Sequence, residues 1–300
     1  MGERFRDPAD VMERLRDAGY LADESIASVV FLADRLEKPV LVEGPAGVGK
    51  TELAKTLAAV TGSRLLRLQC YEGLDESRAL YEWNYRKQLM RIQAGGGVPE
   101  ATGDWGDVEA DIFSEPYLLE RPLLAAVRAR DDVVLLIDEV DRVEVETEAL
   151  LLEVLAEFQV TIPELGTITA TRRPLVVLTS NNTRELSEAL RRRCLFLALE
   201  YPTMEREREI LLARIPGIED RLAQQVARVV RAARRLDLRK TPSIGESIDW
   251  ARALMALGHV DITAAALAET LPVLIKSRPD LTTAARELHA GDPARPTAPG

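Results

Sequence analysis

The sequence predicts an α/β chain, in which a parallel sheet is covered by helices on both faces and is followed by an all-helical segment. Three observations carry this prediction. Apolar runs of strand length alternate with helical patterns, a glycine-rich loop joins the first such run to a helix, and strand patterns stop after Glu200-Tyr201-Pro202. Successive parallel strands need a crossover between them, and a helix is the usual crossover.

The elements of the sheet follow an N-terminal helical segment at residues 8–36. The expected strands and helices, in chain order, are a strand at 39–42, a helix from Thr51, a strand at 65–69, a helix at 76–91, a strand at 133–137, a helix around 150–158, a strand at 174–182 and a strand from Leu195. Residues 133–137 form an unbroken apolar run, which is typical of a strand buried on both faces. We expect this α/β core to occupy residues 1–202.

Helical patterns alone continue after Pro202. Apolar residues recur at helical spacing over residues 222–233, and further helices are expected near 244–257 and 262–275. The helix at 222–233 places Arg228, Arg231 and Arg234 on its outward face, and a solvated face is favoured over a nucleic-acid contact because no aromatic residues accompany them. We therefore expect an all-α lid at 203–290 and a disordered tail at 291–300, which is rich in Pro, Gly and Ala.

The glycine-rich loop carries the first chemistry. Residues 44–51, Gly44-Pro45-Ala46-Gly47-Val48-Gly49-Lys50-Thr51, match the phosphate-binding pattern G-x-x-x-x-G-K-[ST] at every specified position. Glycines let backbone N–H groups turn inward around phosphate, and Thr51-Glu52 opens a helix whose N-terminal dipole favours anions. Lys50 is expected to reach the outer phosphates of ATP and the Thr51 hydroxyl to ligate Mg²⁺. A plain surface turn is the alternative, which the flanking strand and helix disfavour.

Two acidic residues end the apolar strand at 133–137. Asp138 at the carboxyl end of a parallel strand is expected to hold Mg²⁺ through its water shell. Glu139 points elsewhere and can polarise a water for attack on the γ-phosphate. Water as the nucleophile would make the chain an ATP hydrolase, ATP + H₂O giving ADP + phosphate, rather than a kinase.

Polar residues also close the next strand and the helix after it. Asn181 follows the strand "PLVVLTS" and could orient the attacking water, although a simple turn is an equal alternative. Downstream, "EALRRRC" packs Arg191, Arg192 and Arg193 at a helix end. An arginine there could stabilise transition-state charge in a neighbouring subunit's site. For Arg191 and Arg192 a solvated basic turn is preferred.

Taken in order, the loop, "LLIDEVD", "TSNN" and the arginine cluster resemble the AAA+ ATPases over roughly residues 20–275. Within that group the chain resembles the MoxR family. A β-hairpin is expected at about 158–171, where "FQVTIPELGTITA" alternates apolar and polar residues around Pro163-Glu164-Leu165-Gly166, and an irregular segment at about 91–117 lies where that clade has an insert in its second helix.

The resemblance implies further roles. Asn181 falls on the first sensor and Arg193 on the arginine finger. The resemblance also implies that the chain works as a ring, expected to be a hexamer, with a von Willebrand A-domain protein as partner. The second sensor departs from the family pattern, because "LRKTPSIGES" has only Arg239 and Lys240 as cations near Ser243. The text "CYEGLDESRALYEWNYRKQLMRIQ" is similar to the subgroup linked to maturation of carbon monoxide dehydrogenase, which implies a metalloenzyme client.

Composition limits the partners. The formal net charge of −10 argues against general nucleic-acid binding, and Cys70 and Cys194 are expected to be buried thiols rather than a disulfide. No apolar run reaches membrane-spanning length and "MGERFRDPAD" lacks a signal peptide's apolar core, so a cytoplasmic location is expected. A protein remodeller is the leading function. Two alternatives are a nucleotide-gated scaffold with negligible turnover and a nucleic-acid motor or clamp loader, the latter disfavoured because residues 158–170 contain no Lys or Arg.

Overall fold

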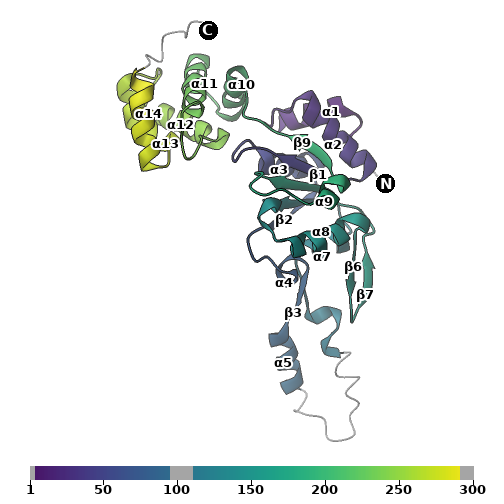
Figure 1. The fold of residues 1–300 in the computed structure, drawn as a ribbon. Helices are drawn as coiled ribbons and strands as arrows, with labels where there is room; N and C mark the ends of the chain where they lie inside the picture. Colours follow the sequence, from purple (N-terminus) through teal and green to yellow (C-terminus); the bar gives the residue numbers. More distant parts are fainter. Residues whose placement is uncertain (1–3, 95–110, 291–300) are drawn as a thin grey trace, which may run out of the picture. The chain divides into compact units, whose positions relative to one another are not determined.

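The computed structural model describes residues 4–94 and 111–290 (Figure 1). Within these residues the chain forms two compact units, each treated by itself below. The first unit takes in residues 4–18, 22–43 and 51–198, and the second takes in 19–21, 44–50 and 199–290. The glycine-rich loop therefore belongs to the second, mostly helical unit, while the helix that it opens runs into the first. Part of the expected insert at 91–117, including Trp105, and the tail at 291–300 lie outside the described residues.

A five-stranded parallel sheet forms the first unit, which confirms the predicted fold class. The strands are β1 (Val40–Glu43), β2 (Arg64–Gln69), β5 (Val133–Asp138), β8 (Leu175–Ser180) and β9 (Leu195–Ala198). Their order across the sheet is β2-β5-β8-β1-β9. Because all are parallel, the carboxyl ends of β5 and β8 lie at the same edge, where Asp138 and Ser180 end adjacent strands.

The position of each strand follows from its sequence. Every residue of β5 and of β8 is buried, as expected for apolar runs covered on both faces. β2 lies at the edge of the sheet and alternates apolar residues with Arg67 and Gln69, which stay exposed. Charged side chains on an edge strand discourage pairing with another chain. The same alternation sends Arg67 and Gln69 to one face of the sheet.

Helices cover the sheet of the first unit (Figure 1). They are α1 (Pro8–Asp17), α2 (Glu24–Leu36), α3 (Lys50–Thr61), α7 (Pro122–Arg128), α8 (Val145–Glu157) and α9 (Glu188–Arg193), with short 3-10 turns at Glu115–Tyr117 (η1) and Val140–Arg142 (η2). Aspartates cap the first two helices, since Asp7 accepts from the backbone N–H of Asp10 and Asp23 from that of Ile26. A side-chain oxygen at this position satisfies an N–H that the helix itself cannot.

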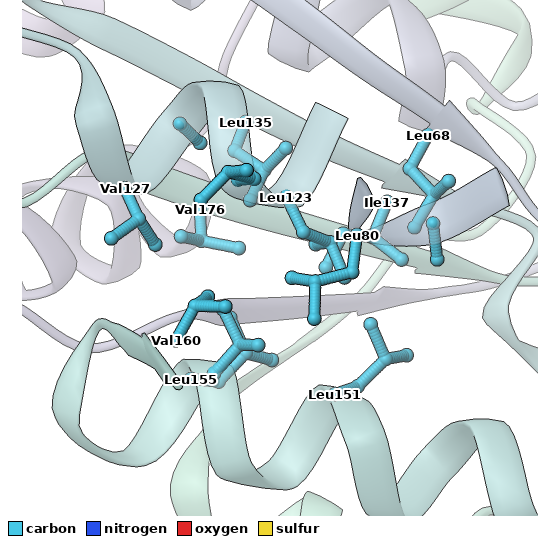
Figure 2. Packing of buried hydrophobic residues seen from close by; sticks show 14 of the residues in the cluster. Leu68, Leu80, Leu123, Val127, Leu135, Ile137, Leu151, Leu155, Val160 and Val176 are labelled. Atoms are coloured by element: carbon cyan, nitrogen blue, oxygen red, sulfur yellow. The ribbon is translucent and has the colours of Figure 1, made fainter. Parts of the chain in front are cut away.

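The core of the first unit lies between the sheet and α7 and α8. Leu151 and Leu155 of α8 point toward the side chains of the sheet and of α7 (Figure 2). The sheet contributes Leu135 and Ile137, both fully buried. Burying one such side chain stabilises the fold by about 1.5–3 kcal/mol, so this packing fixes β5 and with it the position of Asp138.

The sequence predicts one helix over residues 76–91, and this prediction is wrong. Three elements occupy the stretch: α4 (Glu76–Ala79), β3 (Tyr81–Trp83) and α5 (Tyr85–Ala94). β3 pairs antiparallel with β4 (Leu118–Glu120), and the Trp83 ring packs edge-on against Phe113 with centroids 5.3 Å apart. The strand forms because its partners come later in the chain, which local helical spacing does not reveal.

A second antiparallel pair lies where the sequence predicts a hairpin. β6 (Gln159–Ile162) pairs with β7 (Gly166–Thr169), and Gly166 has φ 79°, a left-handed conformation that favours glycine. Thr161 and Thr167 face each other across the pair, with their hydroxyl oxygens 3.1 Å apart. The inward residues Val160 and Ile162 are buried in the core of the first unit.

The second unit is a bundle of helices. Its helices are α10 (Met204–Arg214), α11 (Asp220–Arg234), α12 (Ile244–Ala256), α13 (Ala264–Leu274) and α14 (Arg278–Ala290). Trp250 of α12 is fully buried and donates from Nε1 to the hydroxyl of Thr270 in α13, at 2.7 Å. An indole N–H needs such a partner when buried, so this bond fixes how α12 and α13 pack.

Arg234 corrects one sequence prediction. Its side chain does not face outward: it is 8% exposed and pairs with the buried carboxylate of Glu207. It also donates to the backbone oxygen of Pro242, at 2.9 Å, and lies over the ring of Tyr201. Ser247 donates to the same Glu207 carboxylate, at 2.7 Å. A buried carboxylate needs this set of donors, so Arg234 holds α10, α11 and α12 together.

Candidate nucleotide site

The glycine-rich loop adopts a backbone that glycine favours. Gly47 has φ 77° and Gly49 has φ 99°, both in the left-handed region. The Lys50 ammonium is buried and donates to the backbone oxygens of Gly44, at 2.5 Å, and Pro45, at 2.8 Å. This arrangement places the cation inside the curve of the loop, where an anion bound by the loop would meet it.

The same loop packs closely within the second unit. A Cβ on Gly47 would lie 2.1 Å from the Cβ of Ser243, and a Cβ on Gly44 would lie 2.1 Å from the backbone oxygen of Leu199. The N–H of Ile244 donates to the Gly47 oxygen at 3.1 Å, and the Tyr201 hydroxyl donates to the Ala46 oxygen at 3.0 Å. The first turn of α12 therefore holds the loop directly.

Ser243 also caps α12 by a reciprocal pair of bonds. Its hydroxyl accepts from the N–H of Glu246, while the Glu246 carboxylate accepts from the N–H of Ser243. Burial acts to raise the pKa of Glu246, but these bonds and the charge of Lys240 outweigh it, so the pKa is lowered. The backbone N–H groups of Arg239 and Lys240 donate to the Asp280 carboxylate, and the Lys240 ammonium forms an ion pair with Glu246 at 3.4 Å.

Asp138 is the centre of the acidic part of the site, in the first unit. Its carboxylate is almost fully buried and accepts from the Thr51 hydroxyl at 3.0 Å, from the Thr179 hydroxyl at 2.5 Å and from the guanidinium of Arg67 at 2.6 Å. Thr51 is the residue that follows Lys50 in α3. A hydroxyl and a carboxylate at this separation fit Mg²⁺, which takes oxygen ligands.

Glu139 lies beyond the end of β5 in a left-handed conformation, with φ 59°. A non-glycine residue in this region is uncommon and is often found at functional sites. Its N–H donates to the Thr179 hydroxyl at 2.9 Å. Its carboxylate accepts from the side-chain amide of Gln69 at 3.3 Å and forms an ion pair with Arg142 at 2.9 Å. The carboxylate is about one-third exposed, so a water has access to it.

Asp141 links the two strand ends. One of its carboxylate oxygens, Oδ2, accepts from the N–H of Asn181 at 3.2 Å, and from the N–H and hydroxyl of Thr183. Burial acts to raise the pKa of Asp141, but these hydrogen bonds together outweigh it, and the pKa is lowered. The carboxylate therefore stays charged at neutral pH and fixes the backbone of Asn181 beside the residues that follow β5.

The three arginines at the end of α9 have different surroundings. Arg191 forms an ion pair with the Glu43 carboxylate at 2.7 Å and stacks over the Phe196 ring, so it is held within its own unit. Arg192 is exposed and pairs with the equally exposed Glu188. Arg193 is exposed and donates to the backbone oxygen of Ala189 at 3.3 Å. The Arg191 side chain is 36% exposed, and Arg192 and Arg193 are the more exposed residues of the cluster.

Sequence reasoning did not find four residues that the structure adds to the site: Arg67, Gln69, Arg142 and Thr179. Arg67 and Gln69 reach the acidic residues because β2 pairs with β5, so that Gln69 lies opposite Asp138. The sequence signal for these two residues is their alternation with an apolar residue at the end of "RLLRLQ". Thr179 lies in the segment "PLVVLTS", and a polar residue inside a buried strand needs hydrogen-bond partners.

The predicted phosphate-loop residues are placed as follows. Residues 44–50 lie in the second unit, while Thr51 and Glu52 continue α3 into the first. Val48 is buried and packs under the loop, whereas Pro45 and Ala46 are exposed. The Glu52 carboxylate lies 3.9 Å from the ammonium of Lys55. Within residues 4–94 and 111–290, no group of three or more His, Cys, Asp or Glu side chains is arranged to hold a metal ion.

A protein-family comparison decides the family. A model described as the AAA domain of the dynein-related subfamily matches residues 39–194, which is more than half of the chain. The chain belongs to this AAA family. The match begins at β1 and ends after α9, so it contains the loop, the acidic strand end, Asn181 and the arginine cluster. The AAA family is a family of ATPases with this α/β fold, and the parallel sheet agrees with it.

Curated relatives of this AAA protein include one named as a chaperone and one named as a ClpA homolog. An uncharacterized protein of Staphylococcus haemolyticus is 24% identical over 80% of this chain and 84% of its own length. Chaperone protein ClpB 2 of Parasynechococcus marenigrum is 33% identical over 46% of this chain, and the ClpA homolog protein of Fuscovulum blasticum is 28% identical over 60%. The matches span 13% and 20% of those two longer proteins.

Among solved structures, the AAA protein is similar to the RuvB Holliday junction branch migration motor of Thermotoga maritima. The TM-score is 0.45 at 19% identity, covering 91% of this chain and 68% of that one. This level of likeness carries no functional conclusion. In the described part of the chain no helix combines the length and the apolar character needed to cross a membrane.

Proposed function

We propose that this AAA protein hydrolyses ATP and uses the energy to remodel another protein, working as a ring of identical subunits. The observation that carries the proposal is the Thr51–Asp138 contact at 3.0 Å, with Lys50 preceding Thr51 and Glu139 following Asp138 in the chain. The residues proposed to contact phosphate and those proposed to hold the metal thus lie in the same two short segments of the chain. The ClpB-like and ClpA-like relatives support remodelling as the general use of the energy.

Each residue has a distinct task in this proposal. Backbone N–H groups of residues 44–51 and the Lys50 ammonium bind the phosphates of ATP. Thr51 and Asp138 hold Mg²⁺, which when bound neutralises charge on the phosphates. Glu139 accepts a proton from the attacking water, and Asn181 orients that water. Arg193 of a neighbouring copy stabilises the negative charge that develops on the phosphoryl group.

The first test separates ATP binding from hydrolysis. Purified chain with Mg²⁺ is expected to release phosphate from ATP and to bind a fluorescent ATP analogue. Lys50→Ala is expected to weaken binding of the analogue, because the phosphates lose their cation. Lys55→Ala, a lysine exposed on the same helix, is the matched control and should bind as the wild type does. Binding that is unaffected by Lys50→Ala contradicts the assigned phosphate site.

One observation favours an alternative, a nucleotide-gated scaffold with negligible turnover. The Glu139 carboxylate forms an ion pair with Arg142 and accepts from Gln69, and these partners occupy oxygens that would otherwise contact the attacking water. In a scaffold, ATP would be bound and ring formation gated without hydrolysis. Tight binding of ATP together with phosphate release no faster than in Glu139→Gln would select the scaffold.

The ring is tested by mixing two inactive chains. Arg193→Ala is expected to bind ATP but to hydrolyse it about 10³-fold more slowly. Lys50→Ala keeps its arginine but binds ATP poorly. In mixtures, some interfaces join an intact arginine to an intact ATP site, so activity should exceed the sum of the two variants. If no mixing ratio exceeds that sum, Arg193 does not act in trans.

The finer proposal concerns the client. The MoxR resemblance supports a von Willebrand A-domain protein as partner and a metal-containing oxidoreductase, of the carbon monoxide dehydrogenase type, as the client. The aromatic residues Phe113 and Tyr117 of the segment at 91–117 pack against the core of their own unit. Trp105 lies outside the described residues. Co-purification of the A-domain protein with tagged chain from the native host tests this proposal, and its absence from the complex overturns it.

A further inference from the structure

An acidic groove lies beside the catalytic carboxylates of the first unit. Its volume is about 640 Å³, and its lining includes the carboxylates of Glu72, Asp141, Glu144 and Glu146. Two arginines, Arg142 and Arg184, also line it. Arg142 is the residue that pairs with Glu139, so the wall of the groove is in direct contact with the carboxylate proposed to activate water.

Helix chemistry explains part of this charge. Glu144 is the N-cap of α8 and Glu146 lies in its first turn, where negative side chains stabilise the helix dipole. It does not explain Asp141. That side chain is 3% exposed, and its Oδ1 atom has no hydrogen-bond partner among the described residues although Oδ2 has three. A buried polar atom without a partner is costly, and Arg184 of the same groove also has one, its Nε, among the described residues; an occupant that brings donors would satisfy the Asp141 oxygen.

Val145 adds an exposed apolar side chain to the acidic groove. Its side chain is 67% exposed between the two glutamates, at the start of α8. An occupant that combines a positive head with an apolar stem would satisfy the carboxylates and cover Val145. Arginine has this composition, because its methylene stem packs on apolar surface while its five N–H groups bind carboxylates.

We propose that the groove receives Arg192 of a second copy of this chain, an inference that rests on the proposed ring. Arg192 and Arg193 are the two most exposed arginines of α9, and consecutive Cα atoms lie about 3.8 Å apart. If Arg193 reaches the phosphates next to Glu139 of its neighbour, Arg192 arrives within one residue of that point. The lining of the groove includes Asp141 and Arg142, two and three residues after Glu139, so the two arginines would contact two adjacent acidic parts of the neighbouring copy.

The contact is head-to-tail. The groove of one copy takes the α9 end of the next, which leaves each copy with one groove and one α9 end to offer, as a closed ring requires. Among the described residues of a single chain, Arg192 pairs with Glu188, and an exposed i,i+4 pair contributes little stability. Transfer of Arg192 to a partly buried acidic groove therefore favours assembly.

The test is a charge exchange, read by sedimentation velocity with a non-hydrolysable ATP analogue and Mg²⁺. Glu144→Lys/Glu146→Lys and, separately, Arg192→Glu are each expected to raise the concentration at half-assembly by about tenfold or more. The chain that carries all three substitutions is expected to assemble at nearly the wild-type concentration, since opposite charges again face each other. Glu205→Lys, which reverses an exposed first-turn carboxylate on α10, is the control and should assemble normally.

Folding is checked separately, because lysines at the start of α8 oppose the helix dipole. Circular dichroism and binding of the fluorescent ATP analogue should match the wild type, and Glu144→Gln/Glu146→Gln should show a smaller loss of assembly. Two outcomes overturn the contact while leaving the ring intact: groove variants that assemble as the wild type does, or a triple variant that gains nothing over the single changes. A wild-type chain that remains monomeric with the analogue overturns the ring itself.

Discussion

The Asp138 carboxylate accepts hydrogen bonds from Thr51, Arg67 and Thr179, and Arg67 supplies the positive charge among them. Mg²⁺ and this guanidinium would satisfy the same buried carboxylate. The Arg67 side chain is 48% exposed, so it can leave Asp138 for water at a modest cost. We infer that Arg67 stabilises the nucleotide-free chain and competes with the metal.

Arg67→Met tests this competition. Without nucleotide and Mg²⁺, the variant should lose about 1 kcal/mol of unfolding free energy, because a buried carboxylate loses its charged partner. The Mg²⁺ concentration that half-saturates binding of the ATP analogue should fall several-fold. Arg64→Met, which breaks an exposed pair with Asp131 on the same strand, is the matched control. Equal Mg²⁺ dependence in the two variants contradicts the competition.

Cys70 reports on the same charges. Burial raises the pKa of its thiol to about 12, and the negative charges of Asp138, Asp141 and Glu139 act in the same direction. Because the thiolate is the reactive form, the folded chain should hold about a thousandfold less of it at pH 8 than a thiol with a pKa of 9.0. In Cys194→Ser, iodoacetamide labelling should rise without a plateau up to about pH 10. A labelling rate that reaches half of its maximum near pH 9.0, as expected in denaturant, contradicts the raised pKa.

At the scale of elements, the phosphate loop depends on the start of α12. Gly47 has φ 77° and sits where a Cβ would meet Ser243, whereas Gly217 has φ 81° with nothing within 4 Å of an added Cβ. The two glycines share a conformation and differ in their surroundings. Comparing them separates the cost of the backbone from the cost of the contact.

Gly47→Ala is therefore expected to be worse than Gly217→Ala. Gly217→Ala should cost about 1–2 kcal/mol, the usual cost of a left-handed conformation for a residue with a Cβ. Gly47→Ala should add about 1–3 kcal/mol for overpacking and should weaken ATP-analogue binding, since the loop must move away from Ser243. Thermal unfolding and binding titrations measure both effects. Equal losses in the two variants would mean that the contact with α12 is unimportant.

The elements predicted correctly are those whose own residues are enough to indicate the structure. β5 begins with five apolar residues and β8 with four, and their burial on both faces follows from these apolar runs. β3 was missed because three residues give no periodicity and its pairing with β4 depends on a distant segment. Arg234 was placed outward by helical spacing alone, whereas the buried Glu207 draws it inward. The spacing of residues within one helix does not indicate that a buried charged residue lies on a neighbouring helix.

At the scale of the whole molecule, the residues of the candidate site also fall into those that the sequence predicts and those that it does not. The loop, Asp138 and Glu139 were predictable because each lies in a short segment whose residue types state the chemistry. Arg67 and Gln69 were not, because they reach that chemistry only through the pairing of β2 with β5. Arg142 was not, because its ion pair depends on the left-handed turn at Glu139. These residues contact the carboxylates of Asp138 and Glu139 only because the tertiary structure brings them there.

The central claim is that Glu139 activates the water that cleaves ATP. Phosphate release by Glu139→Gln, measured beside binding of the ATP analogue, tests it most directly. The account predicts unchanged binding and turnover lowered by about 10²–10⁴-fold, the usual contribution of a general base. Glu157→Gln, an exposed glutamate at the end of α8, should hydrolyse ATP as the wild type does. Turnover by Glu139→Gln equal to that of the wild type would contradict the claim.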